Sequence, residues 1–233
     1  MTRLLGTRRL LHAVALAAML GAALGPPPAV AQPADLPATV STLVGAAELL
    51  PPGATAWVPA SLRAEVDVGG SVRMAGAGRT ALRTPSGHSL RIGSFTQIQV
   101  VGAAPGGVDG PLRVKFVAGR LWVAVAPVAG PRPRVAVEAG PATVSVRGSG
   151  VSLRMERDGS VLVRVYHGAA LCAGAAPGNA WERPLKGGEE LVVPAAGPPG
   201  PTRALTREHE EQIWVRWNEE QDAAGYGGPV PPR

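Results

Sequence analysis

The sequence predicts an all-β fold, built from short antiparallel or solenoid-like stacked strands and followed by one C-terminal amphipathic α-helix. Between residues 54 and 193, apolar and polar side chains alternate in short runs. This alternation is typical of strands with one buried face and one face exposed to solvent. Gly, Pro, Asp and Ser separate these runs, and strand starts recur roughly every 8–12 residues, as in an all-β domain. The connections are too short for helical crossovers, which disfavours an α/β fold.

The individual strands follow from this alternation. Asp158-Gly159 is the strongest hairpin signal, because this dipeptide favours the turn whose twist matches paired strands. Gly76-Ala77-Gly78 predicts another turn. The clearest expected strands are 71–74, 79–83, 88–92, 112–116, 120–125, 134–138, 143–147, 151–155, 161–166 and 191–193.

Composition divides the chain into six parts. A patch at 43–50, weakly helical or strand-like, opens the β region and stops at two prolines. The expected parts are a signal peptide (1–31), a linker (32–42), a β domain (43–197), a Pro/Gly linker (198–205), a helix (206–225) and a disordered tail (226–233).

The first 31 residues have the three parts of a secretory signal. Arginines precede an apolar run at 10–24, and Ala29 and Ala31 form an A-x-A site before Gln32. The run is shorter than the ~20 residues of a membrane-spanning helix, so we expect cleavage, the alternative being an uncleaved anchor. The mature chain is therefore expected in the periplasm or outside the cell, and not membrane-spanning after cleavage.

The C-terminal helix has an amphipathic pattern. Thr206 is suited to cap it, and His209, Ile213 and Trp217 follow at i, i+4 and i+8, with Trp214 beside them. We expect Ile213, Trp214 and Trp217 to pack onto the β domain. The alternative is that these three side chains form a partner-binding face.

Charge and cysteine content exclude some classes of protein. The net charge is +6, of which Arg3, Arg8 and Arg9 of the signal contribute three units, so nucleic acid is not expected as a partner. The other arginines are expected to face solvent from strands. Cys172 is the sole cysteine, which rules out an internal disulfide, and its apolar neighbours predict a buried, inert thiol rather than a reactive one.

The sequence carries no motif of catalytic or cofactor chemistry. The histidines of the mature chain, at 88, 167 and 209, lack zinc-site spacing, and no metal or cofactor is expected. The G-x-G-x-x-A run at 76–81 precedes Pro85 and not a helix, so it lacks the helix N-terminus of a phosphate cradle. A carboxylate pair brought together in space remains open, since sequence spacing does not test it.

Four stretches resemble in order and content the FecR-type periplasmic β-domain family: 68–90, 112–125, 135–153, and a fourth made of 163–170 and 185–189. The most specific are Gly119-Arg120-Leu121-Trp122 and Arg147-Gly148. The chain departs from the family pattern where Ser149-Gly150-Val151 replaces Thr-x-Phe, and where Ala139-Gly140-Pro141 stands for the Thr-Pro element. From the residues themselves, we expect Trp122 to fill a core gap, Gly148 to allow a tight turn, and Arg147 to satisfy carbonyls there or to pair with Glu138.

The resemblance implies a sensing module. Related domains relay signals across the inner membrane to a sigma factor, which requires a cytoplasmic segment before a spanning helix. Here few residues precede the apolar run, so we expect no direct sigma-factor contact. The leading hypothesis is a non-enzymatic module that binds an envelope protein or cell-surface component. The alternatives are an exported glycan hydrolase and a structural protein that self-associates through edge strands.

Overall fold

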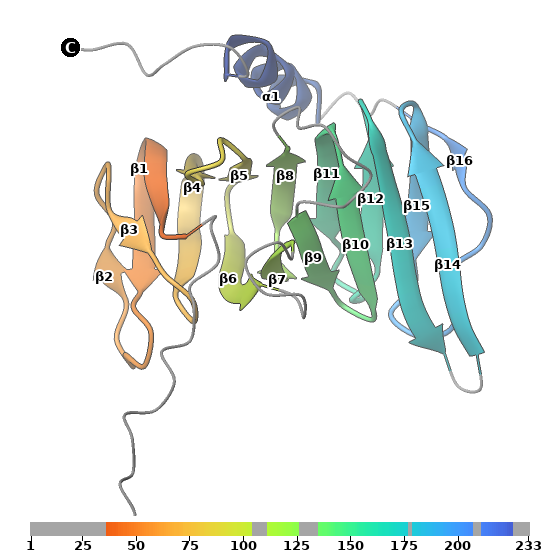
Figure 1. Cartoon of the computed structure of the whole chain (residues 1–233), viewed down its shortest axis with the longest axis horizontal. Coiled ribbons are helices and arrows are strands. Elements are labelled where there is room, and N and C mark those ends of the chain that lie inside the picture. The colour runs from red at the N-terminus through yellow and green to blue at the C-terminus, as the bar shows by residue number, and fades with distance from the viewer. Residues whose placement is uncertain (1–35, 104–110, 126–134, 177–178, 207–210, 226–233) are drawn as a thin grey trace, which may run out of the picture. The chain divides into compact units, whose positions relative to one another are not determined.

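The computed structural model describes residues 36–103, 111–125, 135–176, 179–206 and 211–225, all within the compact unit 32–233. These segments contain sixteen strands and one helix (Figure 1), which confirms the predicted fold class. The strands are β1 (Ala38–Leu50), β2 (Val58–Pro59), β3 (Glu65–Val66), β4 (Ser71–Arg83), β5 (Ser89–Ile92), β6 (Thr96–Ala103), β7 (Leu112–Ala118), β8 (Arg120–Ala124), β9 (Val135–Ala139), β10 (Ala142–Arg147), β11 (Ser149–Met155), β12 (Val161–Val165), β13 (Ala169–Ala176), β14 (Asn179–Lys186), β15 (Glu189–Val193) and β16 (Arg203–Ala204), and the helix is α1 (Gln212–Gly225).

One continuous sheet folds over into two layers. The first layer has the strand order β14–β13–β10–β9–β7–β6, and the second has the order β5–β8–β11–β12–β15–β16. β4 joins them, because its first part pairs with β6 and its last part with β5. In Figure 1, β10, β13 and β14 lie in front of β11, β12 and β15. Every recorded pair is antiparallel except that of β7 with β9.

The expected turn at Gly76-Ala77-Gly78 is wrong, because β4 continues through it as one strand. Gly78 lies opposite Gly45 of β1, at a φ of 142°. A Cβ at Gly78 would lie 2.3 Å from the carbonyl oxygen of Val44. The glycines therefore let β1 and β4 approach closely where β4 passes from one layer to the other.

Apolar side chains from both layers fill the space between them. Ile98, Val114 and Val144 of the first layer, and Leu121 and Leu153 of the second, are fully buried in one cluster. Burial of each such side chain contributes about 1.5–3 kcal/mol relative to exposure. This inter-layer core is the main source of stability. The alternation of apolar and polar residues along the strands predicts it, because it places the apolar side chains of each strand on one face.

Both expected linkers contain strand residues. β1 begins at Ala38, inside the segment 32–42, because Ala38 and Val40 are buried in alternation with more exposed neighbours. The short β16, which pairs with β15, lies inside 198–205. The hairpin predicted at Asp158-Gly159 is confirmed, since β11 and β12 pair on either side of it. The expected tail, 226–233, lies outside the described residues.

The free edge of the first layer is poorly suited to strand addition. Among the described strands, β14 pairs with β13 alone. Pro184 in β14 has no N–H to offer, and Glu182, Arg183 and Lys186 place charges along the strand. Such features discourage edge-to-edge pairing, which weighs against self-association through this edge.

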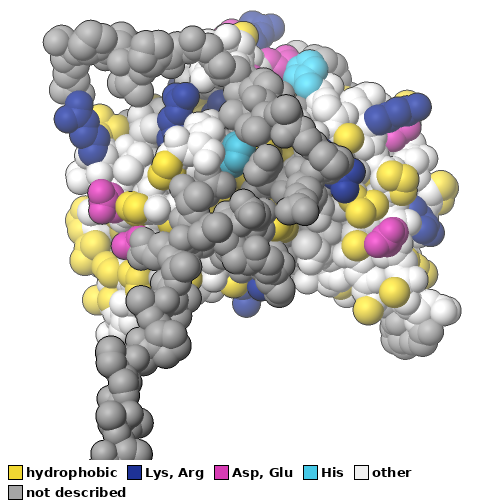
Figure 2. All heavy atoms as spheres, viewed as in Figure 1, with side chains coloured by type: hydrophobic (Ala, Val, Ile, Leu, Met, Phe, Trp, Pro, Cys, Tyr) yellow, Lys and Arg dark blue, Asp and Glu magenta, His cyan; other side chains and the backbone are white. Residues whose placement is uncertain are grey.

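The described residues contain no helix with the length and apolar character needed to cross a bilayer. In Figure 2, cationic and acidic side chains are spread over the visible face in small groups.

Candidate functional site

The outer face of the second layer carries an ordered row of polar and aromatic side chains. Cross-strand pairing aligns one residue from each strand, in the order Arg91, Trp122, Ser152, Arg164, Glu190 and Arg203. Because side chains alternate along a strand, these residues point away from the inter-layer core. Most of this row is buried nevertheless, because α1 packs against part of it.

Helix α1 is held over this face by Asp222. The Asp222 carboxylate accepts a hydrogen bond from Arg91 Nη1 at 2.6 Å and one from Trp122 Nε1 at 3.1 Å. The backbone carbonyl of Asn218 accepts a further bond from Arg91 at 3.2 Å. Since the side chains of Arg91 and Asp222 are both under 10% exposed, loss of either would leave a buried charge unpaired.

Two glutamates extend the ionic contacts. Glu211, directly before α1, accepts hydrogen bonds from Arg154 and Arg164. Glu190 accepts bonds from Arg164 Nε at 2.8 Å and Arg203 Nε at 2.7 Å. Burial by itself raises the pKa of Glu190, but the bonds from Arg164, the Thr206 backbone and Arg203 outweigh it and hold the pKa below its usual value. The expectation that the arginines face solvent is therefore wrong for Arg164, which is buried in ion pairs.

The C-terminal end of α1 is also anchored. Arg83, in the last position of β4, donates a hydrogen bond from Nη2 to the carbonyl oxygen of Gly225 at 3.1 Å. Arg83 also lies opposite Thr39 of β1 in the sheet register.

Helix α1 buries only part of the face that its sequence pattern predicted. Of the expected contacts, Trp214 is buried and Trp217 packs partly buried against the same cluster, whereas Ile213 is 80% exposed. The stripe that faces the sheet is Trp214, Asn218 and Asp222, at i, i+4 and i+8. The arginines beneath it explain the difference, because they require a carboxylate and carbonyl oxygens rather than a purely apolar stripe. Burial of Trp214 also removes it from the alternative partner-binding face.

A small aromatic cluster lies between α1 and the sheet. The rings of Trp122 and Tyr166 stack with centroids 4.9 Å apart, and Trp214 and Val215 complete the cluster. Trp122 is fully buried. It therefore fills a gap in this second cluster, outside the inter-layer core.

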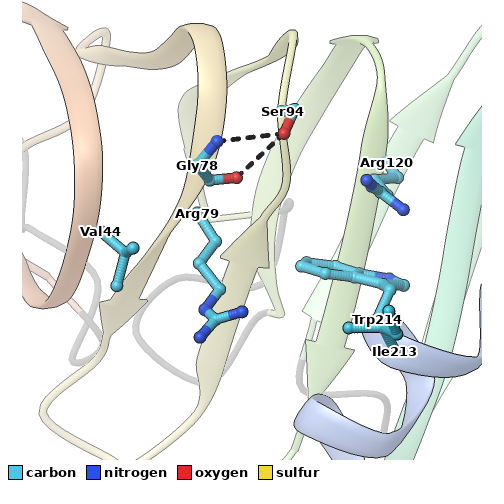
Figure 3. Close-up of a pocket in the computed structure, with 7 residues that line it drawn as sticks. All are labelled: Val44, Gly78, Arg79, Ser94, Arg120, Ile213 and Trp214. Atoms are coloured by element: carbon cyan, nitrogen blue, oxygen red, sulfur yellow. Dashed lines mark hydrogen bonds between the residues drawn. The ribbon is translucent and has the colours of Figure 1, made fainter.

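A pocket of about 330 Å³ opens beside the first turn of α1. Its walls come from β1, β4, the β5–β6 turn, β8 and α1 (Figure 3). The lining residues are Val44, Gly78, Arg79, Ser94, Arg120, Ile213 and Trp214. The Ser94 hydroxyl accepts a bond from the Gly78 N–H at 3.1 Å and donates one to the Gly78 carbonyl at 3.2 Å, which ties the turn to β4.

Two cationic side chains in this pocket lack an ion-pair partner among the described residues. The Arg79 guanidinium lies 4.6 Å from the ring centroid of Trp217, and that of Arg120 lies 5.2 Å from the centroid of Trp214. Burial lowers the pKa of Arg120, an effect that nearby Glu211 opposes. Arg79 Nε and Trp214 Nε1 are buried donors without a hydrogen-bond acceptor in the described part of the chain. The pocket therefore offers positive charge and hydrogen-bond donors, and no described carboxylate forms an ion pair with either guanidinium.

The pocket opening is apolar. Val44 is 48% exposed and Ile213 is 80% exposed. Phe95, the residue after Ser94, is 69% exposed and has a φ of 54°, which is costly for a bulky non-glycine residue. Cationic side chains and exposed apolar side chains thus meet at one corner of the fold.

The residues of the family resemblance fall in two places. Gly119, Arg120 and Trp122 belong to β8 and its preceding turn, at the pocket and under α1. A Cβ at Gly119, whose φ is 86°, would lie 2.3 Å from Thr96 Oγ1, so only glycine fits there. Arg147 and Gly148 lie at the end of β10, where Gly148 has a φ of 85° and Arg147 is exposed.

Of the two contacts considered for Arg147, the pairing with Glu138 finds no support, because Glu138 accepts a hydrogen bond from Arg113. The cleavage-site residues Ala29, Ala31 and Gln32 lie outside the described residues. Within the described segments, no group of three or more His, Cys, Asp or Glu side chains is arranged to hold a metal ion.

Sequence reasoning missed Arg79, Arg91, Glu211 and Asp222 as a set. The alternation along β5, β11 and β12 does place Arg91, Arg154 and Arg164 on the outer face. A face this rich in arginine needs acidic cover, and the helix sequence, rich in Glu and Asp, was the available source.

Comparison with known proteins gives a distant structural likeness. No family model matches the chain, and no curated protein matches it. Two crystal structures from Parabacteroides distasonis ATCC 8503, each of a protein provisionally described as an anti-sigma factor, are similar with a TM-score of 0.46. The first is 16% identical, with 62% of each chain covered, and the second is 15% identical, with 67% of this chain and 74% of that chain covered. The chain thus spans less than two thirds of the length of the first.

Proposed function

We propose that this protein is a non-enzymatic, exported FecR-type binding and sensing module of the cell envelope. Its binding site is the corner of the fold where β4, β8 and the first turn of α1 meet. The observation that carries the proposal is the pocket there, in which Arg79 and Arg120 lack ion-pair partners among the described residues beside exposed apolar side chains.

The site is held rigidly before any ligand arrives. Arg79 and Arg120 are strand residues, and Trp214 is placed by a helix that Asp222 fixes to the sheet. A preorganised site loses little conformational entropy on binding. This favours recognition as the role of the corner.

The acidic residues near the site favour binding over hydrolysis. Glu190, Glu211 and Asp222 each accept hydrogen bonds from arginine side chains. A general acid needs a raised pKa, whereas that of Glu190 is lowered. These carboxylates therefore serve as anchors for α1 and β16.

As a sensing module, the protein acts through contact with another envelope component. The proposed partner is an envelope protein or a cell-surface component. Any control of a sigma factor passes through a second, membrane-spanning protein. No cofactor is part of the proposal.

Site-directed photocrosslinking in the native envelope tests this function. A photoreactive amino acid at Ile213 is expected to give a specific adduct, because Ile213 is 80% exposed at the pocket opening. The matched control is Val117 on β7, which is 43% exposed on the other layer. The adduct at 213 should disappear with Arg120→Met.

Identical adducts at positions 213 and 117 would contradict the proposed site. Hydrolysis of wall glycans by the purified protein, with no adduct at 213, would favour the enzyme alternative. N-terminal sequencing of the exported protein should begin at Gln32; retention of Met1 or Thr2 would indicate an anchored protein.

A further inference from the structure

We infer that the pocket beside α1 binds a small amphipathic carboxylate: an organic acid whose carboxylate is attracted by the positive charges of Arg79 and Arg120 and whose apolar body rests on Val44 and Ile213. The inference rests on the proposed binding function and names its ligand class.

The charge of the pocket calls for an anion. Arg79 and Arg120 contribute two guanidinium groups, and neither forms an ion pair with a described carboxylate. By contrast, Arg91, Arg154 and Arg164 on the same face each have one. The first turn of α1, which supplies Ile213 and Trp214, adds the positive end of the helix dipole.

Unsatisfied donors support the same conclusion. Buried polar groups nearly always have a hydrogen-bond partner, yet Arg79 Nε and Trp214 Nε1 have none among the described residues. Trp214 is 6% exposed and lines the pocket. A carboxylate beside Arg79 can bond Nε and a terminal nitrogen together, in the side-on pairing that guanidinium favours.

The apolar part of the ligand follows from the pocket opening. Val44 and Ile213 are exposed on opposite walls, as Figure 3 shows for β1 and α1. The volume of about 330 Å³ is at the small end of ligand pockets, which suits a short-chain or single-ring acid.

Isothermal titration of the exported, purified protein with hexanoate and benzoate tests the inference. We expect saturable binding of at least one acid, and affinity at least about tenfold lower for hexanamide, which keeps the apolar body and lacks the charge. Inorganic phosphate, which has charge and no apolar body, should also bind at least about tenfold more weakly. Phosphate binding as tight as that of the acids would overturn the amphipathic class.

Three variants locate the binding. Arg120→Met should weaken binding by about tenfold or more, because it removes a charge-assisted contact. Ile213→Asp should do the same by repulsion, and it changes an exposed position that folding does not need. Arg147→Met, an exposed arginine on the first layer, is the matched control and should leave the affinity unchanged. Near-ultraviolet circular dichroism confirms that each variant is folded.

No saturable binding of either acid, or equal weakening by Arg147→Met and Arg120→Met, would overturn the inference. Tight binding that Arg120→Met does not change would also overturn it, since it would place the ligand elsewhere. The crosslink at position 213 reports on the proposed function separately. An adduct at position 213 without acid binding would support the proposed binding function and contradict only the ligand class inferred for the pocket.

Discussion

The two faces of the second layer are stabilised in different ways. Its inner face meets the first layer through fully buried aliphatic side chains such as Leu121 and Leu153. On its outer face, Arg91 and Trp122 donate hydrogen bonds to Asp222 of α1. Aliphatic packing tolerates many partners of similar volume, whereas a buried arginine requires an acceptor at one position. The inner face thus supplies most of the stability, and the outer face specifies which helix covers it and where.

The largest expected effect is in the inter-layer core. Leu153→Ala should lower the free energy of unfolding by about 2–5 kcal/mol, because it leaves a cavity between two layers that cannot collapse. Chemical denaturation followed by circular dichroism measures this. Val192→Ala, on β15 and 40% exposed, is the control and should change stability by about 0.5 kcal/mol or less. Equal losses in the two variants would show that the inter-layer core is not the main source of stability.

A smaller, local effect is expected under α1. Asp222→Ala removes the acceptor of Arg91 and Trp122 and should cost about 1.5–3 kcal/mol. Because α1 can detach and return Arg91 to water, amide exchange should accelerate in α1 while strands of the inter-layer core stay protected. A double-mutant cycle with Arg91→Met should show coupling between the two sites. Uniform acceleration across the chain would show that the two regions unfold together.

The ionic contacts on the outer face of the second layer also make the stability depend on pH. The pKa of Glu190 is lower in the folded protein than in the unfolded chain, so its ion pairs stabilise the fold above the unfolded value of about 4.3. That contribution is lost as the pH falls from there through the folded pKa. Thermal unfolding between pH 7 and pH 3 should show a steeper loss of stability for the wild type than for Glu190→Gln. Parallel profiles would contradict this role of Glu190.

The smallest effect concerns Cys172. Burial in the inter-layer core raises the pKa of its thiol to about 12, so almost no thiolate exists at pH 8. Iodoacetamide should leave the native protein unmodified at pH 8 and alkylate it rapidly in denaturant. Fast alkylation of the native protein would mean that the two layers separate readily.

The strands could be predicted from the sequence because their signal is local. Alternation of Val or Leu with polar residues is read within one strand, and the Asp158-Gly159 turn lies between adjacent strands. The continuity of β4 could not be predicted in this way, because the conformation of Gly78 depends on Gly45 in another strand.

The candidate site depends on the same kind of distant contact. The pattern of α1 alone favoured the face of Ile213, Trp214 and Trp217, whereas Arg91 of β5 selects the stripe that carries Asp222. Arg154 of β11 and Arg164 of β12 pair with Glu211. The pocket likewise combines residues from positions 44 to 214. No local pattern records that Arg79 lies over Trp217 and Arg120 over Trp214. A comparison of the outward-facing arginines with the acidic residues of the helix could have predicted that α1 covers this layer.

The contact between Arg83 and the end of α1 has a practical consequence. Arg83 binds the carbonyl of Gly225 and lies opposite Thr39, so the start of β1 and the end of α1 both lie near the end of β4. The fold is therefore suited to circular permutation, in which a short glycine–serine tether joins these ends and new termini open at Asp158-Gly159. The permuted chain would keep every strand pair and lose only the covalent connection between β11 and β12. Its new termini would lie at a turn that does not line the pocket, and a reporter could be fused there.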